Sequence, residues 1–343
     1  SWGSPTPTDA ATAAAGAGGP PPQQVRVDVG GLDDVALTVQ VLDSIGAKLL
    51  ERRGGKGEPL TLRNVGVKAG EPFYYVVIRG SDRNLVGRYS VRVQAESGTG
   101  GPAEQEPNDD KAHATPLTPG TSMTGFLGPS DHDYYKITSS APQILRAEVS
   151  CPERTNIKLA LHDASGTELY HVDEGGRQEP ELLVDAYVPA GDSYLHVYAG
   201  KGESNVDQPY RLDVRANPDD GTWEHEPNGT PARATPWPAG AGIMRGMIHP
   251  RGDEDYYRVP PPPASAKGIV ASVRPIERVN LALVLTDEHG SVLARSQGAG
   301  EAERVLRTLI DPAHSYFLVV RDEHGKDKQS NPRDAYELHL GFE

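Results

Sequence analysis

The chain has 343 residues, a net charge of −14 at pH 7, 38 glycines and 30 prolines. This length allows two or three domains, and the many turn-forming residues disfavour helical bundles and coiled coils. The negative charge disfavours binding to nucleic acid, because it repels phosphate groups. No stretch approaches the roughly 20 apolar residues that a membrane-spanning helix needs. The single cysteine, Cys151, excludes an intramolecular disulfide and cysteine-based zinc sites.

The chain begins with a segment of low complexity. Residues 1–23 are rich in proline, alanine, glycine and threonine. A segment of this composition cannot bury enough apolar surface to fold. We therefore predict that residues 1–23 are disordered.

Three later stretches follow one pattern and are spaced about 120 residues apart. Each has alternating apolar residues, then an Asp-x-x-Gly turn, and further on a strand that begins with tyrosine. The alternating residues are Leu37, Val39 and Val41 in the first copy, Ile157, Leu159 and Leu161 in the second, and Leu281, Leu283 and Leu285 in the third. A period of two predicts a strand with one buried face. The Asp-x-x-Gly sequence predicts a hairpin turn whose glycine adopts a left-handed conformation.

Strands separated by turns, with no helical periodicity, predict an all-β protein of three tandem antiparallel β-sandwich domains. We place the domains at 24–97, 104–215 and 224–343, with linkers at 98–103 and 216–223. The first copy has no counterpart of the segment that opens the other two. We therefore expect the first sandwich to lack its opening strand or strands, which would lie upstream in a longer protein. Otherwise an unpaired sheet edge is exposed.

The opening segment of the second and third copies carries a shared acidic motif. Glu-x-Glu-Pro-Asn is followed about 25 residues later by Asp-x-Asp-Tyr-Tyr. Calcium prefers six to eight carboxylate, amide or carbonyl oxygens at roughly 2.3–2.6 Å, so this motif is a candidate calcium site. The candidate ligands are Glu104, Glu106, Asn108, Asp109, Asp131 and Asp133 in the second copy, and Glu224, Glu226, Asn228, Asp253 and Asp255 in the third.

The third copy has Gly229 where the second has Asp109, so one oxygen is lost. We therefore expect calcium to bind the 104–215 copy more strongly and the third copy weakly or not at all. The alternative is that the motif is a solvated linker, in which the asparagines make side-chain turns and the aspartates cap a strand. Beside the motif, alternation places one ring of Tyr134-Tyr135 in the core and leaves the other at the surface, where it can stack on a ligand.

The order and spacing of these motifs resemble the bacterial pre-peptidase C-terminal domain, a family that includes the collagen-binding domains of clostridial collagenases. The resemblance covers the second and third copies fully and the first from its third strand onward. It implies jelly-roll-like β-sandwiches of a secreted, periplasmic or cell-surface bacterial protein, usually beside a catalytic domain and without catalysis of their own. In the collagen-binding relatives, the equivalent acidic segment and aspartate pair chelate calcium.

Two functional classes follow. The first is a non-catalytic extracellular array of modules in a larger protein, which binds a protein or glycan partner and accompanies an upstream part of the same precursor. Its variant is an accessory C-terminal region of a secreted protease or other hydrolase that aids secretion or substrate binding. The second class is an enzyme, but no His-Glu-x-x-His, Gly-x-Ser-x-Gly or phosphate-binding glycine motif occurs. A deep pocket with strongly perturbed titratable groups would support the enzyme class.

Overall fold

The structure is a computed structural model that describes residues 24–67, 71–96, 102–296, 304–324 and 327–343. The predicted disordered segment 1–23 lies outside the described residues. The contacts divide the chain into two compact units, one of residues 1–107 with 128–130 and one of residues 108–127 with 131–343. Apart from one 3-10 turn, Pro231–Arg233, the regular elements are β-strands, which confirms the all-β prediction. No helix in the described part of the chain is long and apolar enough to cross a membrane.

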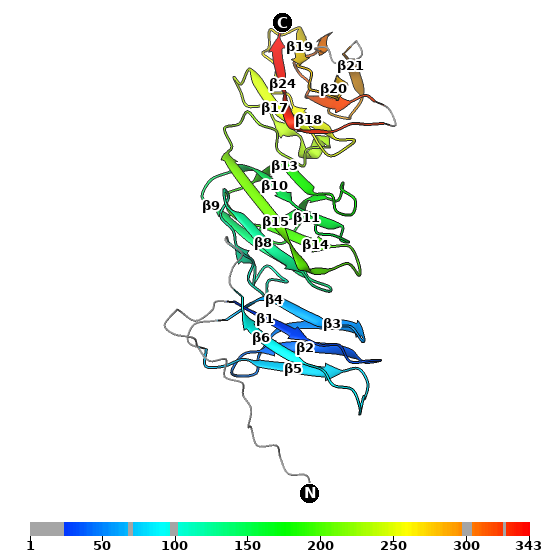
Figure 1. Cartoon of the computed structure of the whole chain (residues 1–343). Helices are drawn as coiled ribbons and strands as arrows, with labels where there is room; N and C mark the ends of the chain where they lie inside the picture. Colours follow the sequence, from blue (N-terminus) through cyan, green and yellow to red (C-terminus); the bar gives the residue numbers. More distant parts are fainter. Residues whose placement is uncertain (1–23, 68–70, 97–101, 297–303, 325–326) are drawn as a thin grey trace. The chain divides into compact units, whose positions relative to one another are not determined.

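The second sandwich consists of a four-stranded and a five-stranded sheet (Figure 1). In spatial order, the first sheet contains β13 (Glu181–Val188), β10 (Gln143–Val149), β15 (Asn205–Pro218) and β8 (Ser122–Leu127). The other contains β12 (Glu168–Val172), β11 (Ile157–His162), β14 (Gly191–Ala199), β9 (His132–Ser139) and β7 (Thr115–Pro116). Pro218 pairs with Gln143, so β15 includes the first three residues of the predicted linker 216–223.

The third sandwich repeats this topology. Its four-stranded sheet contains β22 (Arg304–Leu309), β19 (Gly268–Val273), β24 (Asn331–Phe342) and β17 (Ile243–Ile248). Its five-stranded sheet contains β21 (Val292–Arg295), β20 (Leu281–Asp287), β23 (Tyr316–Asp322), β18 (Glu254–Arg258) and β16 (Thr235–Pro236). Each strand occupies the place of its sequence counterpart in the second sandwich, as the repeat predicts.

The first sandwich contains only six strands among its described residues. One sheet has β4 (Leu60–Gly66), β1 (Gln24–Val29) and β6 (Val91–Ala95), and the other has β3 (Lys48–Lys56), β2 (Ala36–Leu42) and β5 (Tyr75–Gly80). Its first described strand, β1, pairs with β4 and β6 as β10 pairs with β13 and β15. Counterparts of β7, β8 and β9 would precede residue 24, outside the described residues, so the lack of opening strands stays a prediction. The sheets end at β5 and β6, where Tyr75, Val91 and Val93 are 46–47% exposed.

The repeated pattern accounts for the three cores and the three hairpins. All nine alternating apolar residues named above are at most 3% exposed. Gly46, Gly166 and Gly290 have φ of 85°, 95° and 80°, and each donates its backbone N–H to the aspartate carbonyl three residues earlier at 3.0–3.1 Å. The left-handed conformation explains why glycine ends each turn.

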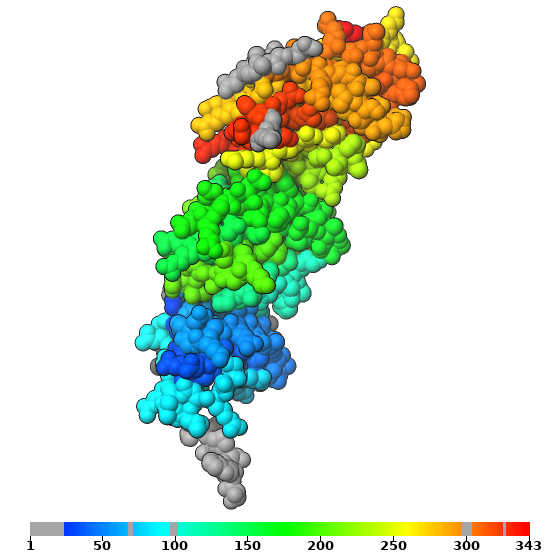
Figure 2. All heavy atoms as spheres, turned by 90° about the vertical axis from the view of Figure 1, so that its right-hand side faces the viewer, coloured from blue at the N-terminus to red at the C-terminus, as the bar shows by residue number. Residues whose placement is uncertain are grey.

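The second and third sandwiches belong to the same compact unit and contact each other directly (Figure 2). Tyr170 Oη in β12 donates to His249 O at 3.1 Å. His249 Nε2 lies 2.8 Å from Leu182 O in β13. Arg146 in β10 donates to Pro332 O at 2.7 Å. This contact region borders the acidic segment that opens the third sandwich.

Candidate metal centre

The opening segment of the third sandwich connects two sheet edges. Glu224 N donates to Arg245 O at 2.8 Å, which places the segment beside β17. Two residues later, Glu226 N donates to Asp185 O at 3.0 Å and Tyr187 N donates to Glu226 O at 3.1 Å, which places it beside β13 of the second sandwich. Both β17 and β13 are edge strands, so one short segment pairs with an edge of each sandwich.

The segment and β18 bring the predicted ligands of the third copy together. Glu224, Glu226 and Asn228 alternate along the segment and are at most 4% exposed. Three carboxylate oxygens, one each from Glu224, Glu226 and Asp255, lie within 4.8 Å of one another. Asn228 Nδ2 donates to Glu224 Oε2 at 3.1 Å. Asp253 lies just before β18 and contributes to the electrostatic field at Asp255.

Hydrogen bonds from the third sandwich fix these carboxylates in place. Met247 N donates to Glu224 Oε1 at 2.6 Å, and His249 N donates to Asp253 Oδ2 at 2.8 Å. Tyr336 Oη donates to Asp255 Oδ2 at 2.6 Å. Both oxygens of Glu224 are held in this way, because Glu224 Oε2 also accepts from Tyr336 Oη at 3.3 Å. At Asp255 the donor holds only Oδ2, so Oδ1 is left for a further partner.

A fifth carboxylate comes from the second sandwich and was not among the predicted ligands. Asp185 lies in an irregular stretch of β13, where the register shifts between the pairs Leu145–Ala186 and Ala147–Leu183, and has a left-handed φ of 48°. Its side chain is within hydrogen-bonding reach of Glu224. The sequence offered only a weak signal for this residue, a charged side chain inside the apolar run of β13.

Four buried oxygens at this centre have no hydrogen-bond partner among the described residues. They are Asp185 Oδ2, Glu226 Oε1, Asn228 Oδ1 and Asp255 Oδ1. An unpaired buried carboxylate is costly unless a cation compensates it. The donor set consists entirely of carboxylate and amide oxygens, which are the ligands that calcium prefers.

The carboxyl groups also perturb one another strongly. Burial raises the pKa of Glu224 well above its usual value, and the charges of Asp255, Asp185 and other neighbouring carboxylates raise it further. Burial likewise raises the pKa of Asp253 to about 7. It raises the pKa of Asp185 to about 6, although Arg146 opposes this effect. Without a cation, the folded protein therefore keeps protons on several of these groups near neutral pH.

The predicted ligands of the second copy fall into both compact units. Glu104 and Glu106 belong to the first, where Asn64 Nδ2 donates to Glu104 Oε1 at 3.0 Å. Arg52 forms a buried ion pair with Glu106 at 2.7 Å. Glu106 N donates to Asn64 O at 2.9 Å, so this segment pairs with β4 as Glu226 pairs with β13.

The remaining residues of that set, Asn108, Asp109, Asp131 and Asp133, belong to the second unit. Asn108, Asp131 and Asp133 are at most 7% exposed, whereas Asp109 is partly exposed. Tyr210 Oη donates to Asp133 Oδ2 at 2.6 Å. This contact matches the one from Tyr336 to Asp255, so the tyrosine–aspartate pair is common to both copies.

The predicted division of the tyrosine pair is confirmed. Tyr135 is fully buried, and Tyr134 is half-buried. The Tyr134 ring stacks on His196, with ring centroids 4.1 Å apart and planes at 9°, so one of its faces is already covered. Burial, assisted by the neighbouring histidines, lowers the pKa of His196 to about 3.

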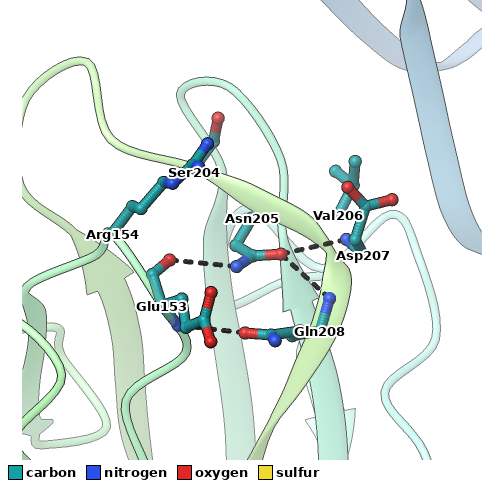
Figure 3. Close-up of a pocket in the computed structure, with 7 residues that line it drawn as sticks. All are labelled: Glu153, Arg154, Ser204, Asn205, Val206, Asp207 and Gln208. Atoms are coloured by element: carbon teal, nitrogen blue, oxygen red, sulfur yellow. Dashed lines mark hydrogen bonds between the residues drawn. The ribbon is translucent and has the colours of Figure 1, made fainter.

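The surface hollows differ from the buried acidic centre. One hollow of about 360 Å³ lies between the 153–154 and 204–208 loops (Figure 3). Its polar groups pair with one another, since Asn205 Nδ2 donates to Glu153 O at 3.0 Å and Gln208 N donates to Asn205 Oδ1 at 2.9 Å. The strongly raised carboxyl pKa values described above belong to the buried centre and not to this hollow.

Comparisons with known proteins gave the following results. No family model matches the chain, and no curated protein matches its sequence. Among solved structures, a pre-peptidase C-terminal domain of a collagenase from Bacillus anthracis is 19% identical, over 30% of this chain and 94% of that chain, with a TM-score of 0.26. The CUB1-EGF-CUB2 domains of rat MASP-1 are 10% identical, over 66% of this chain and 100% of that chain, with a TM-score of 0.19. The BSP domain of a biofilm associated protein is 8% identical, over 93% of this chain and 75% of that chain, with a TM-score of 0.16.

Proposed function

We propose that this chain is a non-catalytic array of β-sandwich modules from a larger secreted or surface bacterial protein, and that calcium stabilises it. The observation that carries the proposal is the buried centre of the third sandwich, where carboxylate oxygens gather within 4.8 Å and several have no partner. Glu224, Glu226, Asn228, Asp253 and Asp255 would hold the ion. Bound calcium would neutralise their charge and fix the opening segment on the sandwich.

The donor set favours calcium over other metals. Zinc and copper prefer imidazole and thiolate ligands, whereas this centre presents carboxylates and an amide. Magnesium requires a near-ideal octahedron and retains several waters, which suits a deeply buried centre poorly. Calcium sites of extracellular modules have dissociation constants of about 0.1–1 mM, and we expect a value in this range.

This proposal reverses the order expected from Gly229, which assigned the stronger site to the second copy. The second-copy segment already has a cation, because Arg52 pairs with Glu106. At the third-copy segment, the largest charge effects on Glu224 come from other carboxylates. The third copy therefore has the greater need for a metal ion.

We also propose that the array belongs to the pre-peptidase C-terminal family and binds a protein or glycan partner. The motif order and the repeated topology support the family. The half-exposed apolar side chains on β5 and β6 favour a protein partner, because sheet edges recruit added strands. The variant proposal, an accessory region of a secreted protease or other hydrolase, shares the same modules and differs only in the domain that they accompany.

Calorimetry in calcium and in chelator tests the metal. We expect calcium to raise the melting temperature of the wild-type chain and Glu224→Gln to remove most of that increase. The matched control is Glu277→Gln, which changes an exposed glutamate of the same sandwich (72% exposed side chain) and should behave as wild type. Equal melting of the wild-type chain in calcium and in chelator would refute the calcium site.

A further inference from the structure

We propose that Asp185 of the second sandwich supplies a ligand to the calcium centre of the third, so that one ion joins the two sandwiches. This inference rests on the proposed calcium site at Glu224, Glu226, Asn228, Asp253 and Asp255. It adds a ligand from a different domain and gives the ion a second role. The ion then stabilises the contact between domains as well as one fold.

The position of Asp185 supports this role. Its backbone carbonyl accepts the Glu226 N–H at 3.0 Å, and its carboxyl group is within hydrogen-bonding reach of Glu224. The residue is 6% exposed, and Oδ2 has no partner among the described residues. An unpaired, buried oxygen beside the other ligands is what a shared cation would use.

The basic residue that influences Asp185 has other partners. Arg146 lies in β10, next to β13, and its guanidinium donates to Pro332 O at 2.7 Å. The same nitrogen lies 3.9 Å from Met247 Sδ. Arg146 therefore connects the second sandwich to the third but forms no ion pair with Asp185 in the described part of the chain.

The first sandwich shows how this position behaves without a carboxylate. Asn64 occupies the place of Asp185, with a φ of 50° and the same backbone pairing to the opening segment. Its amide donates to Glu104 at 3.0 Å. Because asparagine and aspartate tolerate the left-handed region better than most residues, Asp185→Asn should fold normally and remove only the charged ligand.

A shared ligand couples the stability of the two sandwiches. Calcium that binds only when both are folded stabilises both by mass action. The chain provides a probe for this effect, because its single cysteine lies in the second sandwich. Cys151 is partly buried against that core, and its Sγ lies 3.0 Å from Thr155 O. Opening of the second sandwich should therefore control how fast a thiol reagent labels Cys151.

The experiment uses the full chain in moderate urea, with calcium binding measured by titration calorimetry and Cys151 labelling measured with and without calcium. We expect Asp185→Asn to weaken calcium binding by about 10-fold or more, since affinity follows the charge of the ligand set. In the wild-type chain, calcium at about 100 times its dissociation constant should slow labelling by up to about 100-fold. Asp185→Asn should show little slowing at that same calcium concentration. Asp192→Asn, on the surface of the second sandwich, is the matched control and should behave as wild type.

The outcomes separate this inference from the proposed function. If the wild-type chain binds calcium, Glu224→Gln does not, and Asp185→Asn matches the wild type in both affinity and labelling, the calcium site stands but the shared ligand is refuted. If calcium binds without slowing the labelling of Cys151, the coupling of the two sandwiches is likewise refuted. If the wild-type chain binds no calcium, both proposals fail.

Discussion

Two equivalent segments of this chain place glutamates in buried positions, but the charges around these glutamates differ. Each pairs through a glutamate with an edge strand, at a residue with left-handed φ: Glu106 at Asn64 in β4, and Glu226 at Asp185 in β13. On the first sandwich, Arg52 supplies a positive charge to Glu106. Its counterpart in the second sandwich, by strand register, is Val172, which pairs with Leu159 as Arg52 pairs with Val39.

The difference shows that two side chains change the electrostatics of an opening segment while its backbone pairing stays the same. Arginine in β3 and asparagine in β4 provide a cation and a hydrogen-bond donor. Valine in β12 and aspartate in β13 provide neither and add a negative charge. A buried carboxylate must then obtain its compensation from protons or from a metal ion.

The largest expected effect comes from removing the built-in cation. Arg52→Ala leaves the Glu106 carboxylate buried without its guanidinium partner, so we expect the first sandwich to lose about 3–5 kcal/mol of unfolding free energy. Urea unfolding measures this loss, and calcium should not restore it. Arg53→Ala, at the neighbouring exposed position, is the control. Similar losses in the two variants would show that the ion pair does not stabilise this segment.

A second comparison concerns the tyrosines that hold Asp133 and Asp255. Tyr210→Phe and Tyr336→Phe each remove a hydrogen bond to a carboxyl group and should cost their own sandwich about 1.5–3 kcal/mol. Tyr336→Phe should also weaken calcium binding at the third-sandwich centre, because Asp255 loses the donor that orients it. Tyr210→Phe should leave that affinity unchanged. Equal calcium affinities of the two variants would mean that Asp255 needs no orientation by Tyr336.

The effect of calcium should depend on pH. Burial raises the pKa of Asp253 to about 7 and that of Asp185 to about 6. In the metal-free protein, the contribution of these groups to stability is therefore present near pH 4 and is lost as the pH rises towards 7. Calcium must displace those protons, so its affinity should fall about 10-fold per pH unit for each proton displaced, below about pH 7 for Asp253 and below about pH 6 for Asp185. Melting temperatures with and without calcium at pH 5 and pH 8 test this, and an equal calcium-induced shift at both values would contradict it.

The smallest effect is expected from Gly229→Asp, which restores the residue of the second copy. A Cβ at Gly229 would lie 3.6 Å from Glu254 O, an ordinary contact, so the side chain fits. Asp109, in the equivalent place, is partly exposed and accepts the His132 N–H at 3.3 Å. The new carboxylate should therefore cap β18 and change calcium affinity by about threefold or less. An increase of 10-fold or more in a calorimetric titration would restore the order that the sequence alone predicts.

Much of the fold could be predicted because its signals are local. Alternation at Leu37, Leu159 and Leu283 and the glycine of each Asp-x-x-Gly turn depend on a few adjacent residues. The acidic motif likewise identified Glu224, Glu226 and Asp255 as a group. Each of these features repeats along the chain, and the repetition supports patterns that are weak when they occur once.

Asp185 and Arg52, which the sequence did not predict as site residues, contact segments that are distant in the sequence. Asp185 reaches the centre because an irregular stretch of β13 and a left-handed backbone turn it towards a segment about 40 residues later. Arg52 reaches Glu106 from β3 because strand pairing brings an inward-facing position beside the opening segment. Neither the Asp185 contact nor the Arg52 contact is encoded by a short sequence motif. The only sequence signal for Arg52 is its place two residues after Leu50, on the same buried face of β3.

The residue with left-handed φ beside each opening segment, Asn64 or Asp185, determines how that segment is held. Asparagine carries an amide where aspartate carries a carboxyl group. A single substitution at this position would therefore set whether the opening segment depends on calcium. At low calcium concentration, the proposed contact through Asp185 would be loose, whereas Asn64 holds Glu104 by a hydrogen bond that needs no metal ion. As the calcium concentration rises, the proposed shared ion would couple the second and third sandwiches more tightly.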